Sequence, residues 1–194
     1  MTSGQFWSWF VAHEPQLWAI ADRDSEILEE LRAALSAYRR GLCLEVSDEE
    51  RGARELIISA AGDRTLFAAV EALVTEAPGL TRWRFTALKP PRGFGFVLNT
   101  RELRLDPKVM VFEPLSNDED PHALGLRVFV PQATGSAELQ EAVSRVVETG
   151  IGERALSAIQ HIEVASLEGP ASEHIPLTDL PAYLDWFARK SSSG

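Results

Sequence analysis

A run of basic residues between positions 82 and 108, here called the basic zone, is the part of this sequence best suited to binding a ligand. It holds seven basic and two acidic residues, whereas the whole chain of 194 residues has a net charge of −10. Arginine and lysine side chains pair with carboxylates and phosphates. We therefore predict a surface for a small anionic ligand or for an acidic patch of another protein, with candidate side chains Arg84, Lys89, Arg92, Arg101 and Arg104.

The same charges have a purely structural interpretation. Acidic turns lie on both sides of the basic zone, at Ser47–Glu50 and at Ser116–Asp120. Basic side chains that only neutralise such turns form exposed ion pairs, which contribute about 0–1 kcal/mol each. We favour this structural interpretation for most of the basic zone.

The hexapeptide Arg92–Val97 (RGFGFV) matches the first six positions of the signature strand of RNA-recognition motifs. In such strands exposed aromatic rings stack on RNA bases, and Phe94 and Phe96 would be those rings. However, Asn99 stands where the signature has a final aromatic residue, and the acidic chain repels phosphates at long range. RNA binding is therefore a minor alternative, and we expect a bend or an edge strand here.

Two other motifs match known sites only in part. Residues 150–155 fit the pattern G-x-G-x-x-A, but a predicted helix precedes them where a dinucleotide site needs a strand, so we expect a helix C-terminus and a turn. The second acidic turn contains residues that could ligate a hard metal ion, but their spacing matches no calcium loop: Asp118, Glu119, Asp120 and His122. We predict no cofactor and no metal.

The sequence shows no catalytic constellation. Cys43 is the only cysteine, and we predict it to be a small buried residue on a strand. The histidines are far apart in sequence, and no serine lies in the frame of a nucleophile elbow. An enzyme is therefore the less favoured class.

The elements that would position these residues are centred on the stretch from Arg54 to Phe96. Leu56–Ile58 predicts a strand, and Trp83–Ala87 alternates as in a half-buried strand. Between them, apolar residues recur at helical spacing and predict an amphipathic helix: Leu66, Phe67, Val70, Leu73, Val74 and Ala77. With a strand near residues 42–46, the first half is predicted to be a ββαβ unit over about residues 42–91.

The second half has the same predicted order over about residues 108–170. Strands are expected near residues 109–112, 124–130 and 159–167, with a helix after Ser136. Because the element order and the acidic turns match, we predict a degenerate internal duplication. Residue identity between the halves is poor, so convergence on a common supersecondary pattern is the alternative.

Helices rich in aromatic residues are predicted at both ends, within residues 5–40 and 178–190. The first should end near Pro15, because proline disfavours a helical residue before it. The second should begin at Asp24 or Ser25. Their aromatic residues include Phe6, Trp7, Trp9, Phe10, Trp18, Tyr183, Trp186 and Phe187.

The overall composition limits the class of protein. Hydrophobic residues make up 45% and charged residues 25%, and no apolar run is long enough to span a membrane. The N-terminus lacks the basic and apolar regions of a secretory signal. We therefore expect a cytoplasmic protein that binds neither membranes nor nucleic acid.

Three stretches carry a resemblance to a known family: FWSWF near the N-terminus, ISAAGD followed by LVTEAP, and WRFTALKPPRGF. They resemble a family of uncharacterised bacterial cytosolic proteins. The resemblance covers most of the chain and implies one intact domain, without implying an activity.

We therefore predict one α+β domain over residues 1–194. It would have two tandem ββαβ units forming a mixed sheet, helices covering the sheet, and aromatic-rich terminal helices. The favoured function is a non-catalytic protein-binding or regulatory module, of which an immunity-type inhibitor of a toxin is one example. The alternative is an enzyme or a binding protein for a small anionic ligand at the basic zone.

Overall fold

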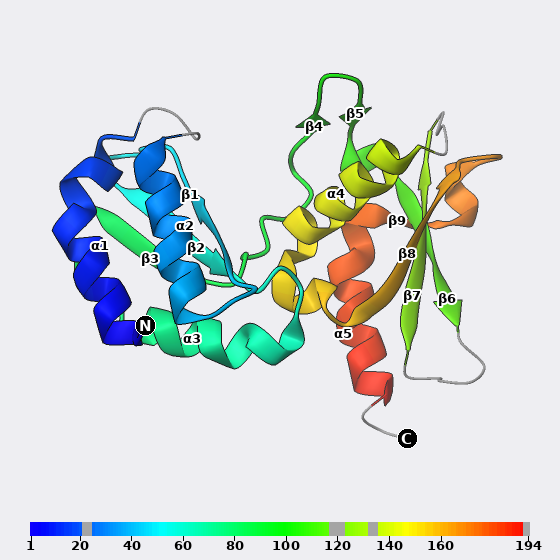
Figure 1. Cartoon of the computed structure of the whole chain (residues 1–194). Coiled ribbons are helices and arrows are strands. Elements are labelled where there is room, and N and C mark those ends of the chain that lie inside the picture. The colour runs from blue at the N-terminus through cyan, green and yellow to red at the C-terminus, as the bar shows by residue number, and fades with distance from the viewer. Residues whose placement is uncertain (21–24, 117–122, 132–135, 192–194) are drawn as a thin grey trace. The chain divides into compact units, whose positions relative to one another are not determined.

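Figure 1 shows the computed structural model, which describes residues 1–20, 25–116, 123–131 and 136–191. Contacts between residues divide the chain into two compact units, Met1–Lys89 (unit 1) and Pro90–Gly194 (unit 2). Each unit has its own hydrophobic core. The predicted α+β class is confirmed in both, whereas the single domain over residues 1–194 stays a prediction.

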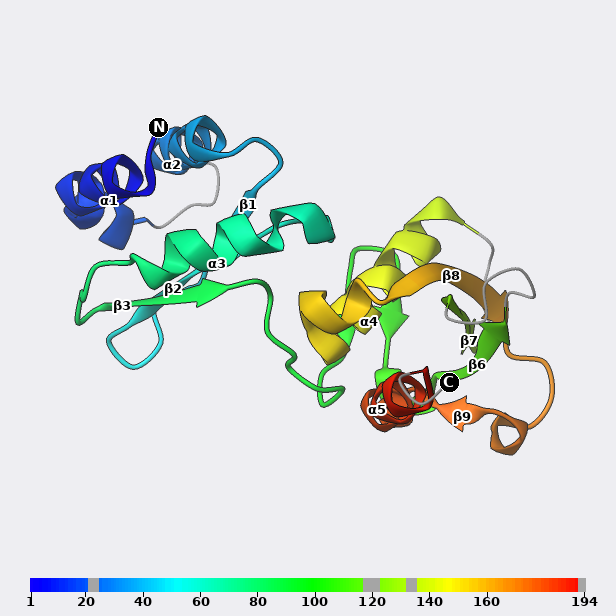
Figure 2. The same cartoon turned by 90° about the horizontal axis from the view of Figure 1, so that it is seen from below.

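Unit 1 is a three-stranded mixed sheet with helices on one side (Figure 2). Its elements are α1 (Ser3–Trp18), α2 (Glu26–Tyr38), β1 (Cys43–Val46), β2 (Arg54–Ser59), the 3₁₀ helix η1 (Arg64–Leu66), α3 (Phe67–Thr75) and β3 (Trp83–Ala87). The middle strand β2 is antiparallel to β1 and parallel to β3. Its Leu56 lies opposite Val46 on β1 and opposite Phe85 on β3.

The apolar face predicted for the helix between β2 and β3 is confirmed. On α3, Phe67, Val70 and Leu73 are buried. On α2, which begins after the N-cap residue Ser25, the buried residues include Leu28, Leu31 and Leu35. The alternative cap Asp24 lies outside the described residues.

Aromatic rings fix α1 against β3. The ring centroid of Phe10 lies 5.1 Å from that of Trp83 and 5.3 Å from that of Phe85, both edge to face. The indole N–H of Trp7 donates to the carbonyl of Leu73 on α3 at 2.8 Å. The aromatic N-terminal helix thus forms a large part of the unit 1 core.

The prediction that the first helix ends at Pro15 is wrong. α1 continues to Trp18 with Pro15 inside it, although a proline inside a helix costs about 3 kcal/mol. The last turn carries Leu17, which is fully buried, and Trp18, whose ring centroid lies 6.2 Å from that of Trp83. Burial of this turn offsets the hydrogen bond lost at the proline.

Unit 2 contains a four-stranded mixed sheet and a separate two-stranded hairpin. Its elements are β4 (Leu98–Asn99), β5 (Arg104–Leu105), η2 (Pro107–Val109), β6 (Val111–Ser116), β7 (Leu124–Val130), α4 (Ala137–Leu156), β8 (Ile159–Ser166), η3 (Ala171–Glu173), β9 (Ile175–Pro176), η4 (Leu177–Asp179) and α5 (Leu180–Ser191). The sheet order is β8-β7-β6-β9, with β7 antiparallel to β6 and parallel to β8. β4 pairs only with β5, antiparallel.

The ββαβ order predicted for each half is confirmed. β1-β2-α3-β3 and β6-β7-α4-β8 share the same strand order and the same directions. Each unit has its own mixed sheet, and an origin by duplication stays a prediction. β6 begins two residues later than expected, because the side chain of Asp106 accepts a hydrogen bond from the N–H of Lys108 and starts the turn η2.

One face of the unit 2 sheet forms the core with α4 and α5. Along β7 every second residue, from Leu124 to Val130, is buried. On α5, Leu180 is fully buried and the ring of Tyr183 lies 5.5 Å from that of Phe112. Trp186 is 47% exposed, and the ammonium of Lys190 lies 5.2 Å from its ring centroid.

Replacing Phe10 with alanine should lower the free energy of unfolding by about 3–5 kcal/mol, because its ring is fully buried among other aromatic rings. Urea unfolding followed by circular dichroism measures this loss. Val11→Ala on the same helix is the control and should cost less than about 0.5 kcal/mol, since Val11 is exposed. Equal losses in the two variants would contradict the assigned helix face.

Candidate functional site

The basic zone is divided between the two units. Its first three basic residues, Arg82, Arg84 and Lys89, belong to unit 1, and the other four, Arg92, Arg101, Arg104 and Lys108, belong to unit 2. Neither unit alone therefore supports the predicted common binding surface.

In unit 1, two basic side chains of the basic zone pair with carboxylates of the same unit. Arg82 donates from Nη2 to both carboxylate oxygens of Glu14, at 2.8 and 2.9 Å, and its guanidinium lies over the ring of Trp18. Lys89 Nζ lies 3.0 Å from Glu45 Oε1. These contacts fit the structural interpretation, in which the cations neutralise the protein's own acidic side chains.

Three further candidate cations belong to different segments of the chain. Arg84 is exposed on β3, opposite Glu55 in the strand register. Arg92 is exposed, and its backbone N–H donates to the carbonyl of Thr149 at 2.9 Å. Arg101 is exposed in the turn of the β4–β5 hairpin.

Phe94 and Phe96 belong to the core of unit 2. Phe94 is only 7% exposed, and its ring lies directly over Gly150, where an added Cβ would be 2.1 Å from Phe94 Cε1. Phe96 is partly buried against the same core. Residues 92–97 form bends and no strand. An enclosed ring cannot stack on a base, so the exposed aromatic strand that RNA binding requires is not formed.

The glycines at positions 150 and 152 have structural roles in α4. Gly152 has φ 80° and ψ 161° inside the helix, a region that is nearly restricted to glycine. The sequence predicted a helix C-terminus and a turn at this point. The structure instead has a kink at Gly152, after which the helix continues to Leu156. Gly150 leaves the space that the ring of Phe94 fills.

Cys43 is exposed on the edge strand β1, which corrects the prediction that it is buried. The strand alternates, and its neighbours Leu42 and Leu44 take the inward positions. The residues of the second acidic turn that were weighed as metal ligands, and not favoured, lie outside the described residues: Asp118, Glu119, Asp120 and His122. Among the described residues, no group of three or more histidine, cysteine or acidic residues could hold a metal ion.

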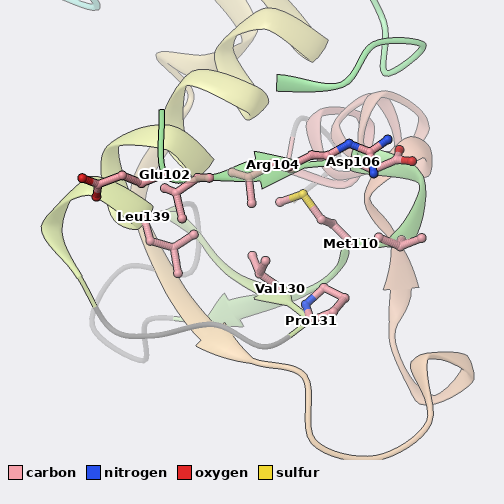
Figure 3. Close-up of a pocket in the computed structure, with 10 residues that line it drawn as sticks. Glu102, Arg104, Asp106, Met110, Val130, Pro131 and Leu139 are labelled. Carbon is pink, nitrogen blue, oxygen red and sulfur yellow. The ribbon is translucent and has the colours of Figure 1, made fainter. Parts of the chain in front are cut away.

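A pocket of about 450 Å³ lies in unit 2 beside the β4–β5 hairpin (Figure 3). This volume is in the range of small-ligand pockets, about 300–1,000 Å³. β5 runs along one side, and Val130 and Pro131 lie across from it (Figure 3). The lining residues are Glu102, Leu103, Arg104, Leu105, Asp106, Val109, Met110, Val130, Pro131 and Leu139.

The pocket has an apolar floor and a charged rim. Leu105, Met110, Val130 and Leu139 are all buried parts of the unit 2 core. The charged rim residues come from the hairpin segment: Glu102, Arg104 and Asp106. The pocket therefore combines an apolar surface with both signs of charge at its edge.

Local hydrogen bonds shape the hairpin wall of the pocket. The hydroxyl of Thr100 accepts from the N–H groups of Glu102 and Leu103, at 3.3 and 2.9 Å. The N–H of Thr100 donates to the carbonyl of Leu103 at 2.8 Å and closes the turn. Sequence reasoning missed this hairpin and therefore the pocket. The available signal was the strict alternation of charged and apolar residues from position 102 to 106.

A row of charged side chains crosses the sheet face of unit 2 that is opposite the helices. Arg127 donates to Glu113 at 2.6 Å and to Glu163 at 2.9 Å, and the three residues are register partners on β6, β7 and β8. The hydrogen bond from Arg127 lowers the pKa of Glu163 below its ordinary value. These side chains are 36–40% exposed, so we assign them a role in strand register.

Comparisons of the chain with protein-family models, curated proteins and solved structures found no match in any of the three. The resemblance to a bacterial family therefore stays a prediction, and the pocket is interpreted from its own chemistry. In the described part of the chain, no helix has the length and apolar character needed to cross a lipid bilayer.

Gly150→Ala should lower the free energy of unfolding by about 1–3 kcal/mol, because the added Cβ would overlap the ring of Phe94. Urea unfolding of four proteins measures the coupling free energy between positions 94 and 150: the wild type, Gly150→Ala, Phe94→Leu and the double variant. The cost of Gly150→Ala should be smaller in the Phe94→Leu background. An equal cost in both backgrounds would contradict the contact.

Proposed function

We propose that this protein is a non-catalytic protein-binding module and that the pocket of unit 2 receives an apolar side chain of its partner. Seven of the ten lining residues are apolar, so an apolar occupant gains most by leaving water. An apolar pocket inside a charged rim is also the arrangement in which anchor side chains bind at protein interfaces.

Val109 is the observation that favours a protein over an enclosed small ligand. It lines the pocket and is 54% exposed, and Pro131, which also lines it, is exposed. A small ligand inside the pocket would leave this outer apolar surface in water. A partner protein would cover the surface and the pocket together.

Arg104 favours a second candidate function, the binding of a small molecule with an apolar body and an anionic group. Its side chain is exposed at the rim, and the pocket volume of about 450 Å³ suits such a molecule. In this second candidate function, Arg104 is the residue of the basic zone that binds the anionic group.

A photoreactive benzoylphenylalanine in place of Val109 should cross-link a second polypeptide when cells that naturally make this protein are illuminated. The matched control is the same amino acid in place of Val11, which is also an exposed valine but lies on α1 of unit 1. Mass spectrometry identifies the adducts. Val109→Arg should abolish binding of the identified partner, because the arginine would place a charge in the apolar contact.

A cross-linking yield from position 109 no higher than that from position 11 would contradict the protein-binding proposal. Native mass spectrometry of the purified protein then tests the second candidate. A bound small molecule that Arg104→Ala releases would support it.

A further inference from the structure

We propose that the partner binds as an extended segment that adds to the free edge of β5 as a third strand. Its sequence would alternate basic, apolar, acidic, apolar and basic residues. This inference rests on the proposed function, since it presupposes that the pocket of unit 2 binds a protein. It adds the conformation and the sequence pattern of the segment that binds.

The backbone of Arg104 carries the hydrogen-bonding groups that such a strand needs. At the closed end of the hairpin, the N–H of Thr100 donates to the carbonyl oxygen of Leu103 at 2.8 Å, so Thr100 and Leu103 form a hydrogen-bonded pair. Hydrogen-bonded and non-hydrogen-bonded pairs alternate along an antiparallel ladder, and the next pair is Asn99 with Arg104. The N–H and C=O of Arg104 therefore point away from β4.

These two groups are available for an incoming strand. Within the residues that the structure describes, no turn or loop hydrogen bond involves the N–H or C=O of Arg104, and the alternation of pairs makes Asn99 and Arg104 a non-hydrogen-bonded pair of the ladder. All residues from 102 to 106 line the pocket, and β5 borders it along its length (Figure 3). One donor and one acceptor on the same residue form the pair with which an extended peptide joins a sheet edge.

The side chains of this edge determine which sequence fits it. Residues 102–106 alternate between charged and apolar: Glu102, Leu103, Arg104, Leu105 and Asp106. Opposite charges in directly facing positions stabilise a strand pair. The partner residue opposite Arg104 should therefore be acidic, and the residues opposite Glu102 and Asp106 should be basic.

The two residues between these charged positions should be apolar. In a strand, successive side chains point to opposite faces, so they would share the side of Leu103 and Leu105. Leu105 is buried in the core, together with the floor residues Met110, Val130 and Leu139. Apolar side chains at these positions would fill the pocket.

The probe is a capped peptide of sequence SGKVEVKGS, titrated into the isotope-labelled full chain and followed by NMR. Its matched control is SGEVKVEGS, which has the same apolar residues and reversed charges. We expect the probe to shift the amide signals of residues 102–106, Val109 and Val130. The control peptide should bind at least about fivefold more weakly, because each of its charges faces a like charge.

Two variants separate the backbone of Arg104 from its side chain. Arg104→Pro removes the side chain and, from the backbone, only the N–H that points away from β4, a place where an edge strand tolerates proline; Arg104→Ala removes the side chain alone. It should weaken binding at least about tenfold, whereas Arg104→Ala should weaken it about two- to fivefold. Methylating the backbone nitrogen of the peptide's central glutamate removes the facing donor and keeps the test valid if Arg104→Pro fails to fold.

The outcomes distinguish this inference from the proposed function. Suppose the peptide binding is lost in Val109→Arg but unchanged by Arg104→Pro and by N-methylation. The strand addition would then be wrong, although the pocket would still bind a protein. Equal binding of the two peptides would also overturn the inference. A third outcome is that a partner is cross-linked at position 109 but the probe peptide does not shift the pocket signals. This would overturn only the proposed sequence pattern of the partner segment.

Discussion

A parallel pair of strands can be joined only by a crossover that passes over one face of the sheet, and both units are built on such a pair. In unit 1 the crossover from β2 to β3 contains α3, and in unit 2 the crossover from β7 to β8 contains α4. The crossover helix covers one face of the middle strand, and the side chains buried on that face include Leu56 in unit 1 and Val128 in unit 2. The terminal helices then complete the same buried face.

This dependence explains why much of the fold could be predicted. α3 and β7 have regular apolar patterns, and the period of each pattern indicates which face of the element is buried. The end of α1 could not be predicted, because burial of Leu17 by residues distant in sequence outweighs the local effect of Pro15. β4 and β5 contain only two residues each, and the alternation over residues 102–106 is too short to define a hairpin by itself.

The candidate site was harder to predict than the fold. The charge of Arg82 and Lys89 was evident in the sequence, but their pairing with Glu14 and Glu45 depends on tertiary contacts. The pocket likewise needs β5, the end of β7 and the start of α4 to meet. Of the basic residues in the basic zone, Arg104 alone lines the pocket, whereas the apolar floor is made of residues for which the sequence indicated no binding role: Leu105, Met110, Val130 and Leu139.

The distribution of tryptophan gives each unit a different optical signal. Of the five tryptophans, Trp186 is in unit 2, where about half of its surface is exposed and Lys190 lies over its ring. The other four lie in or against the aromatic core of unit 1: Trp7, Trp9, Trp18 and Trp83. Intrinsic fluorescence of the chain therefore reports mainly on unit 1. In a chain with Trp186→Phe it would report on unit 1 alone, so that denaturation of one unit could be recorded while the other is still present.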